Sequence, residues 1–186
     1  MELELSPDKI AALARRIDRP LVLVGMMGVG KTSVGRRLAA QLQLPFSDAD
    51  EEIVRAAQMS IPEMFEQFGE PYFRSGERRV IARLVETGRG VIATGGGAFV
   101  NDQTRALILA KAIPVWLDSD VATLLDRVGR SDKRPLLNHG NPREILIRLR
   151  TEREPFYSQA PIKVISGAGP HARTLDKVLK GIDQWL

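Results

Sequence analysis

The stretch LVLVGMMGVGKTSVG, residues 21–35, decides the fold of this chain. It opens with four consecutive apolar residues, as expected of a strand that is covered on both faces. Residues 25–32 then read G-x-x-x-x-G-K-T, the pattern of a phosphate-binding loop whose backbone N–H groups surround phosphate oxygens. In such a loop the lysine contacts the β- and γ-phosphates and the threonine hydroxyl binds Mg²⁺. We therefore predict a strand, a nucleotide-binding loop and a helix that begins at Lys31, rather than an ordinary glycine turn with an incidental lysine.

Strand and helix patterns alternate along the rest of the chain. Apolar runs predict further strands at residues 45–47, 91–94, 113–117 and 162–165. Short helices are predicted after a cap at Ser6 and after a capping box at Ser60. Further helical patterns span residues 31–42, 51–57, 71–87, 104–111, 120–128, 142–154 and 174–186. This alternation predicts an α/β fold with a parallel sheet of about five strands, whose ligands bind at the carboxyl ends of the strands.

Composition limits the classes of function. With 186 residues and 44% hydrophobic content, the chain is expected to form one domain with a proper core. It has no cysteine, and His139 and His171 are too few for a zinc centre. A net charge of +4, spread arginines and 5% aromatic residues argue against a nucleic-acid protein. An acidic N-terminal segment and the lack of a long apolar run favour the cytoplasm over secretion or a membrane.

A phosphate-binding loop alone does not separate a switch GTPase, a motor ATPase and a small-molecule kinase. A GTPase would carry an Asn-Lys-x-Asp motif, which is absent. A motor would carry an apolar strand that ends in Asp-Glu. Residues 115–118 fit the start of that pattern, but Ser119 and Asp120 follow, and we expect Ser119 to cap the helix over residues 120–128. A kinase needs a second site that holds a hydroxyl in line with the γ-phosphate.

Four features could build that second site. Asp48 and Asp50 follow the second strand, where Asp48 suits a water-mediated Mg²⁺ contact and Asp50 a substrate hydroxyl, although both could simply cap the next helix. Arg74 and Glu77 are spaced i, i+3, so Glu77 can orient Arg74, although a surface ion pair has the same spacing. Three glycines at residues 95–97 let a ligand approach the backbone closely.

The fourth feature is the irregular loop at residues 129–141, which carries or adjoins several cations. These are Arg127, Arg130, Lys133 and Arg134. Ordinary solvated charge is the default for such a loop, but its position suits a lid that closes over phosphates. Lys31 itself is expected to be a charge on a solvent-facing loop, so its loss should leave the fold intact.

Together and in this order, these motifs resemble the shikimate kinase family. The motifs are GMMGVGKT, Asp48-x-Asp50, Phe73-Arg74-x-x-Glu77, Gly95-Gly96-Gly97, Arg134-Pro135-Leu136-Leu137 and Arg153-x-x-x-Tyr157, within residues 21–179. The resemblance implies a P-loop fold of the nucleoside-monophosphate-kinase type, with a five-stranded parallel sheet flanked by helices. It also implies transfer of the ATP γ-phosphate to the 3-hydroxyl of shikimate in aromatic amino-acid biosynthesis, with Mg²⁺ as the cofactor. On this view residues 1–186 are one domain, with an N-terminal helical extension over residues 1–20 and a lid loop over residues 129–141.

The resemblance also implies a role for each matching residue. ATP would be bound by Gly28, Val29, Gly30, Lys31, Thr32, Ser33, Arg127 on the adenine side and Arg134 from the lid. Mg²⁺ would be held by Thr32, with Asp48 behind it. Shikimate would be bound by Asp50, Arg74, Gly95, Gly96, Gly97, Arg153, Phe65 and Phe73. Asp50 is the candidate base, and Lys31 and Arg134 complete the catalytic set. Two arginines suit an anionic acceptor because the guanidinium fork matches a carboxylate.

Two other readings compete with this one. A gluconate kinase would share the loop and the sheet but would not be expected to carry Arg74 and Arg153 aimed at a ring carboxylate. A regulatory protein that binds ATP without transferring phosphate would not need Lys31, Asp50 and Arg134 together. We expect a monomer that acts on small molecules, with no nucleic-acid or membrane partner. No residue of the 166–170 segment can be assigned to adenine.

Overall fold

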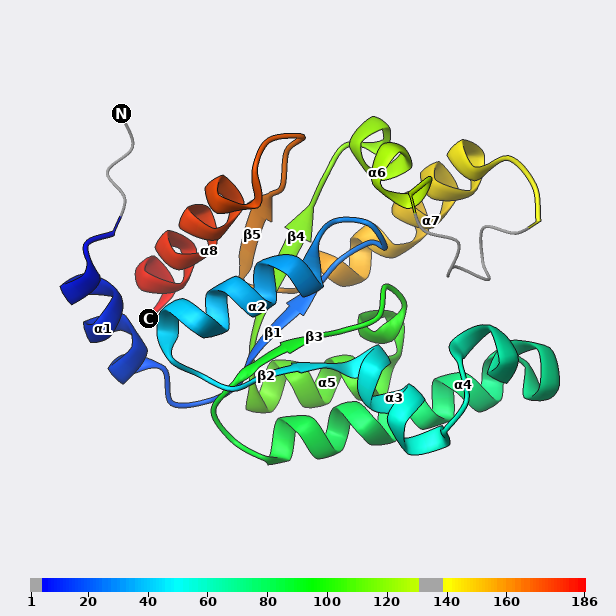
Figure 1. The fold of residues 1–186 in the computed structure, drawn as a ribbon, viewed down its shortest axis with the longest axis horizontal. Coiled ribbons are helices and arrows are strands. Elements are labelled where there is room, and N and C mark those ends of the chain that lie inside the picture. Colours follow the sequence, from blue (N-terminus) through cyan, green and yellow to red (C-terminus); the bar gives the residue numbers. More distant parts are fainter. Residues whose placement is uncertain (1–4, 131–138) are drawn as a thin grey trace.

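The structure is a computed structural model that describes residues 5–130 and 139–186 (Figure 1). Its centre is one sheet of five strands, all parallel, in the order β2-β3-β1-β4-β5. The strands are β1 (Leu21–Val24), β2 (Phe46–Asp48), β3 (Val91–Ala93), β4 (Ile113–Asp118) and β5 (Ile162–Ile165). The five-stranded parallel sheet predicted from the sequence is therefore confirmed.

Helices cover both faces of the sheet. They are α1 (Pro7–Arg16), α2 (Lys31–Leu42), α3 (Ala49–Ala57), α4 (Ile61–Glu86), α5 (Asp102–Lys111), α6 (Val121–Val128), α7 (Pro142–Tyr157) and α8 (His171–Trp185), with a short 3₁₀ helix η1 (Ala98–Val100). In Figure 1, α2 crosses in front of the sheet with α8 packed against it, and α5 lies behind the sheet. The whole of β1 and β4 is buried, as the continuous apolar run of residues 21–24 predicts for a central strand.

The start of α3 differs from the prediction in a way that matters for the site. Strand β2 continues to Asp48, and the helix begins at Ala49 rather than at Glu51. Asp48 is the N-cap, because its side chain accepts hydrogen bonds from the backbone N–H groups of Asp50 and Glu51. Asp50 lies in the first turn of the helix. Local pattern does not reveal this shift, since a carboxylate at either position could cap the helix.

The predicted short helix after Ser60 and the predicted helix at residues 71–87 form one element, α4, with a kink. The Ser60 capping box is present, with Glu63 as the reciprocal partner. The kink is at Gly69, whose φ of 80° and ψ of 171° leave the helical region. A positive φ favours glycine, and Pro71 cannot supply the N–H that a continuous helix would need there.

The predicted cap of α6 was wrong by one residue. Asp120, and not Ser119, is the N-cap, and its side chain accepts from the Thr123 backbone N–H. The Ser119 hydroxyl instead donates to the carbonyl of Ser166 across the strand ends. That tertiary contact competes for the hydroxyl and leaves the cap to the carboxylate.

Most of the predicted lid loop, residues 131–138 with Lys133 and Arg134, lies outside the described residues. Within the described part of the chain, no helix is both long and apolar enough to cross a membrane.

Candidate active site

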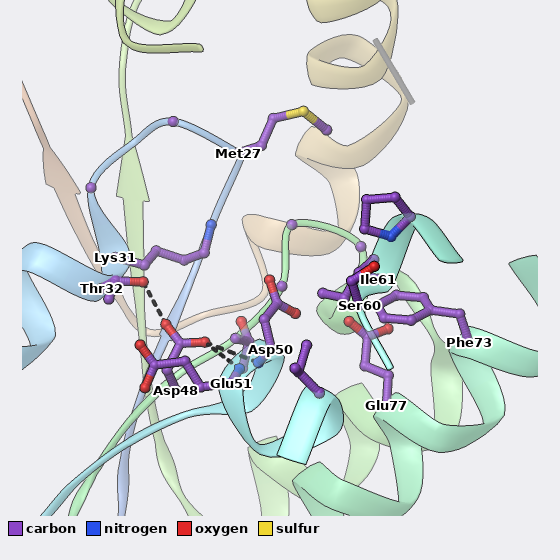
Figure 2. Close-up of a pocket in the computed structure, with 18 of the residues that line it drawn as sticks. Met27, Lys31, Thr32, Asp48, Asp50, Glu51, Ser60, Ile61, Phe73 and Glu77 are labelled. Atoms are coloured by element: carbon purple, nitrogen blue, oxygen red, sulfur yellow. Dashed lines mark hydrogen bonds between the residues drawn. The ribbon is translucent and has the colours of Figure 1, made fainter. Parts of the chain in front are cut away.

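A cavity of about 1210 Å³ opens at the carboxyl ends of β1, β2 and β3. Its lining comes from the phosphate-binding loop, from α3 and α4 (Figure 2) and from the three glycines after β3. Single residues of α6, α7 and α8 complete it. Of the predicted site residues that are described, all but Val29 line it. The Val29 side chain is fully buried in the core, so this residue can face a ligand only through its backbone.

The phosphate-binding loop is shaped by its glycines. Gly25 and Gly30 have φ angles of 140° and 101°, which L side chains rarely adopt. A Cβ on Gly25 would also lie 2.2 Å from the carbonyl oxygen of Leu117 in the neighbouring strand. The loop ends at Lys31, where α2 begins and its first free N–H groups are available to an anion.

Lys31 does not occupy the solvent-facing position expected of it. The residue is only 8% exposed, and its Nζ donates to the carbonyls of Gly25 at 2.7 Å and Met26 at 2.9 Å. The expectation was wrong because the loop folds back over the lysine, and the spacing of residues in the sequence does not predict this fold of the loop. The ammonium group is thus held across the loop, and Figure 2 shows its side chain extending toward the cavity.

Thr32 and Asp48 meet on the other side of the loop. The Thr32 hydroxyl donates to Asp48 Oδ2 at 2.5 Å, while Asp48 Oδ1 caps α3. The carboxylate therefore serves as a helix cap and as a partner of the loop at the same time. A hydroxyl and a carboxylate oxygen are suitable ligands for Mg²⁺, which takes its remaining ligands from phosphates and water. The described residues hold no group of three or more acidic, histidine or cysteine side chains that could bind a metal alone.

Asp50 points its carboxylate into the same cavity from the first turn of α3 (Figure 2). Its Oδ1 atom is buried and has no hydrogen-bond partner. Burial first, and then the nearby charges of Asp48 and Glu77, raise the pKa of Asp50 to about 6 against the opposing effect of Lys31 and Arg74. A carboxylate with a pKa near the working pH is well placed to accept a proton.

Arg74 and Glu77 form a partly buried pair, in which Glu77 is buried and Arg74 half-buried, and not the surface pair that their spacing also allowed. Their side chains are joined by a 2.8 Å hydrogen bond, and Glu77 is 3% exposed. Glu70 holds the other side of the guanidinium at 3.2 Å. A Cβ on Gly97 would lie 2.7 Å from the Arg74 guanidinium, so this glycine makes room for the arginine. Burial raises the pKa of Glu77, against the opposing effect of Arg74 and Arg153.

Arg153 reaches the cavity from α7. It is 7% exposed, and its Nη1 atom is buried without a hydrogen-bond partner. Phe65 and Phe73, with ring centroids 5.0 Å apart, supply an apolar wall. The cavity therefore combines cationic groups, an apolar wall and unpaired acceptor oxygens on Asp50 and Glu77. Such a set suits an anionic ligand that also carries hydroxyl groups.

Arg127 joins the phosphate-binding loop to the segment after β5. Its guanidinium donates to the carbonyl of Val29 at 2.9 Å, to the Ser166 hydroxyl at 3.2 Å and to the carbonyl of Gly167 at 2.6 Å. By contrast, Asp118, at the end of β4, does not line the cavity and is held by Arg150 and Lys163. The motor-type reading of residues 115–118 therefore has no support from the structure.

The cavity is also lined by polar residues that the sequence does not mark as site residues, namely Glu51, Arg55, Ser60, Thr94 and His171. Of these, His171 lies beside the phosphate-binding loop. It opens α8, and its imidazole Cε1 lies 3.1 Å from the position of a Cβ on Gly30. Its Nδ1 atom is buried without a partner, and burial together with Arg127 and Arg37 lowers its pKa. The scarcity of histidines argues against a zinc centre but does not locate this one. The nearness of His171 to the loop depends on how α8 docks against α2, which no local motif encodes.

Comparisons with known proteins agree with this geometry. The shikimate kinase family model matches residues 27–183. A shikimate kinase of Novosphingobium aromaticivorans is 67% identical, covering 98% of this chain and 96% of its own length. One of Rhodopseudomonas palustris is 49% identical, covering 97% of this chain and 89% of its own length.

Solved structures give the same answer for the fold. A shikimate kinase of Acinetobacter baumannii in complex with shikimate has a TM-score of 0.88 and 35% identity, covering 96% of this chain and 98% of that one. A shikimate kinase of Aquifex aeolicus has a TM-score of 0.77 and 35% identity, and the match covers 88% of this chain and 96% of that one. A gluconokinase of Sinorhizobium meliloti has a TM-score of 0.55 and 20% identity, and the match covers 90% of this chain and 93% of that one. This likeness concerns the fold alone. The chain belongs to the shikimate kinase family of ATP-dependent kinases, as its motifs predicted.

Proposed function

We propose that the chain transfers the γ-phosphate of ATP to the 3-hydroxyl of shikimate and so supplies shikimate 3-phosphate to aromatic amino-acid biosynthesis. One observation carries the proposal. Asp50 Oδ1, Glu77 Oε1 and Arg153 Nη1 are buried and unpaired in one cavity, which the phosphate-binding loop also lines. Buried polar atoms are seldom left without partners. A carboxylic acid with several hydroxyl groups offers both the acceptors and the donors that these atoms lack.

The nucleotide would bind along the loop. Backbone N–H groups of residues 28–33 and the start of α2 would surround its phosphates, with Lys31 between them and the acceptor. Arg127 would lie on the adenine side. Arg134 is assigned to the phosphates on the resemblance alone, because it lies outside the described residues.

Mg²⁺ would be held by the Thr32 hydroxyl, with Asp48 in contact through water. The two side chains already meet at 2.5 Å beside the loop, which fits such a site. When bound, the ion offsets negative charge on the phosphate oxygens. We also propose that the chain works as a monomer in the cytoplasm, since it has no cysteine and its charge is spread over the sequence.

The transfer itself would use Asp50. The acceptor hydroxyl attacks the γ-phosphorus, the bond to ADP breaks, and the hydroxyl proton passes to the Asp50 carboxylate. The raised pKa of Asp50, about 6, lets the group accept a proton readily while it remains largely ionised at neutral pH. Lys31, held across the loop by the carbonyls of Gly25 and Met26, would stabilise the charge that develops on the phosphate oxygens.

Arg74 and Arg153 would clamp the carboxylate of the acceptor. We expect Arg74→Ala and Arg153→Ala each to weaken shikimate binding about 10- to 100-fold, because each removes a charge-assisted hydrogen bond. ATP binding should change far less. Arg148→Ala is the matched control, since this arginine also lies on α7 but is exposed, and its ion pair among the described residues is with Glu152 at 3.8 Å. Calorimetric titration with each ligand measures both affinities, and equal losses for ATP and shikimate would contradict the clamp.

The proposal is tested by acceptor-dependent release of ADP. Wild-type protein with ATP and Mg²⁺ is assayed with shikimate, with gluconate and with no acceptor. We expect rapid release with shikimate alone, because gluconate is an open chain that cannot place a ring against Phe65 and Phe73. ADP release that is as fast without an acceptor as with shikimate would indicate a nucleotide hydrolase. No ADP release under any of the three conditions would indicate a regulator that binds ATP without transferring phosphate.

A further inference from the structure

Tyr157 lies on the same face of α7 as Arg153, one turn further along the helix. Its hydroxyl donates a hydrogen bond to the carbonyl oxygen of Gly96, the middle residue of the three glycines after β3. The tyrosine is 1% exposed, and its ring packs against Trp116 of β4 at a centroid distance of 6.0 Å. Helix α7, which carries Arg153, thus also contacts the backbone of the cavity wall through the buried side chain of Tyr157.

Gly96 lies where the two halves of the site meet. A Cβ on this residue would lie 3.1 Å from the backbone nitrogen of Met27 and 3.3 Å from Nη1 of Arg153. The glycine therefore touches both the phosphate-binding loop and the proposed carboxylate clamp. Its neighbour Gly97 faces Arg74 in the same way. A small rotation of this backbone would change the space available to both arginines.

Three consecutive glycines have no side chains to fix their backbone, and glycine is the most mobile residue type. The carbonyl of Gly96 and the N–H of Gly97 belong to one planar peptide and point in opposite directions. A hydrogen bond to the carbonyl therefore sets the direction of the N–H as well. Both glycines line the cavity, so this peptide is part of the surface that an acceptor meets.

The hydroxyl of Tyr157 is available as a donor throughout the neutral range. Burial raises its pKa above the ordinary value, although Arg153 and Arg74 act in the opposite direction. A phenol that stays protonated can always donate to a carbonyl. Within the described part of the chain, no other side chain donates to the carbonyl of Gly96.

We propose that Tyr157 is a positioning residue for the acceptor site: its hydroxyl fixes the Gly96–Gly97 peptide, and through it the wall against which the acceptor and the two arginines are placed. The assignment of the acceptor rests on the proposed function. The positioning itself concerns the protein alone and can be measured without a ligand.

Tyr157→Phe in the full chain tests this, because it removes one oxygen and keeps the ring against Trp116. We expect the KM for shikimate to rise about tenfold, because the loss of one hydrogen bond to a buried carbonyl has about that effect on an equilibrium. The KM for ATP should stay within about twofold of wild type. Tyr72→Phe is the matched control. It removes the hydroxyl of the chain's other tyrosine, which is 47% exposed and stacks on Phe68, and should change neither KM.

A second readout needs no substrate. Amide hydrogen exchange over residues 96–99 of the free protein should be at least several-fold faster in Tyr157→Phe than in wild type and in Tyr72→Phe. Equal rises in both KM values, or unchanged exchange at these residues, would overturn the positioning role. Faster exchange in a protein whose wild type does not phosphorylate shikimate would uphold that role and overturn the proposed function instead.

Discussion

Replacing Lys31 with alanine should lower the maximal rate of phosphate transfer about 100-fold or more, because the variant lacks the ammonium group proposed to stabilise developing charge on the phosphates. The structure adds a second expected effect. Nζ of Lys31 holds the carbonyls of Gly25 and Met26, so the variant should also lose part of the order of its loop. Steady-state assays at saturating ATP and shikimate measure the first effect, and thermal unfolding measures the second.

Two further variants separate these effects. Lys31→Met keeps most of the apolar stem that fills the 8% exposed site and should lose the same activity with a smaller loss of stability. Lys111→Met removes an exposed lysine at the end of α5 and should behave as wild type. If Lys31→Ala or Lys31→Met kept near-normal turnover, residues 25–32 would not be the phosphate-binding loop of a kinase.

Asp50→Asn should lower turnover about 100-fold or more while shikimate affinity changes much less. The amide keeps the shape and some hydrogen bonding of the carboxylate but cannot accept the hydroxyl proton. Turnover at saturation and shikimate affinity by titration are the two measurements. A loss of affinity with turnover preserved would reduce Asp50 to a residue that positions the hydroxyl, a result that phosphoryl transfer allows because it often demands little of a base.

The pH dependence of the wild type gives the same test independently. The pKa of Asp50 is raised from 3.8 to about 6, so kcat/KM should fall as the pH falls through about 6 and the base becomes protonated. The limb should vanish in Asp50→Asn. The sign for stability is opposite to that of an ordinary salt-bridged carboxylate. The folded state holds its proton more tightly than the unfolded one, so stability falls as the pH rises from about 4 to about 6. Asp50→Asn should consequently unfold at a higher temperature than wild type at pH 7, which also shows that its inactivity is not misfolding.

The features that could be predicted from the sequence are those encoded by neighbouring residues. The glycines, lysine and threonine of residues 25–32 lie on one turn, and the apolar run before them marks a central strand, so the fold and the nucleotide end of the site followed directly. The capping box at Ser60 is equally local.

Other features depend on contacts between distant segments. The burial of Glu77, a residue of α4, turns a common surface spacing into part of the cavity, and the carbonyl of Ser166 accepts from the Ser119 hydroxyl that would otherwise cap α6. His171 reaches Gly30 only because α8 docks beside α2. Tyr157 could be quoted as part of a motif, but its bond to Gly96 spans 61 residues and has no sequence signal. Each of these needs the packed structure because burial and partner choice are tertiary properties.

The most direct test of the central claim is the position of the transferred phosphate. Wild-type protein is incubated with ATP, Mg²⁺ and shikimate, and the product is examined by phosphorus NMR with coupling to the ring protons. We expect a single phosphomonoester coupled to the proton on carbon 3, formed in equal amount with ADP, because Asp50 and the two arginines are proposed to hold one hydroxyl toward the loop. A phosphate on another hydroxyl, or inorganic phosphate as the only new species, would contradict it.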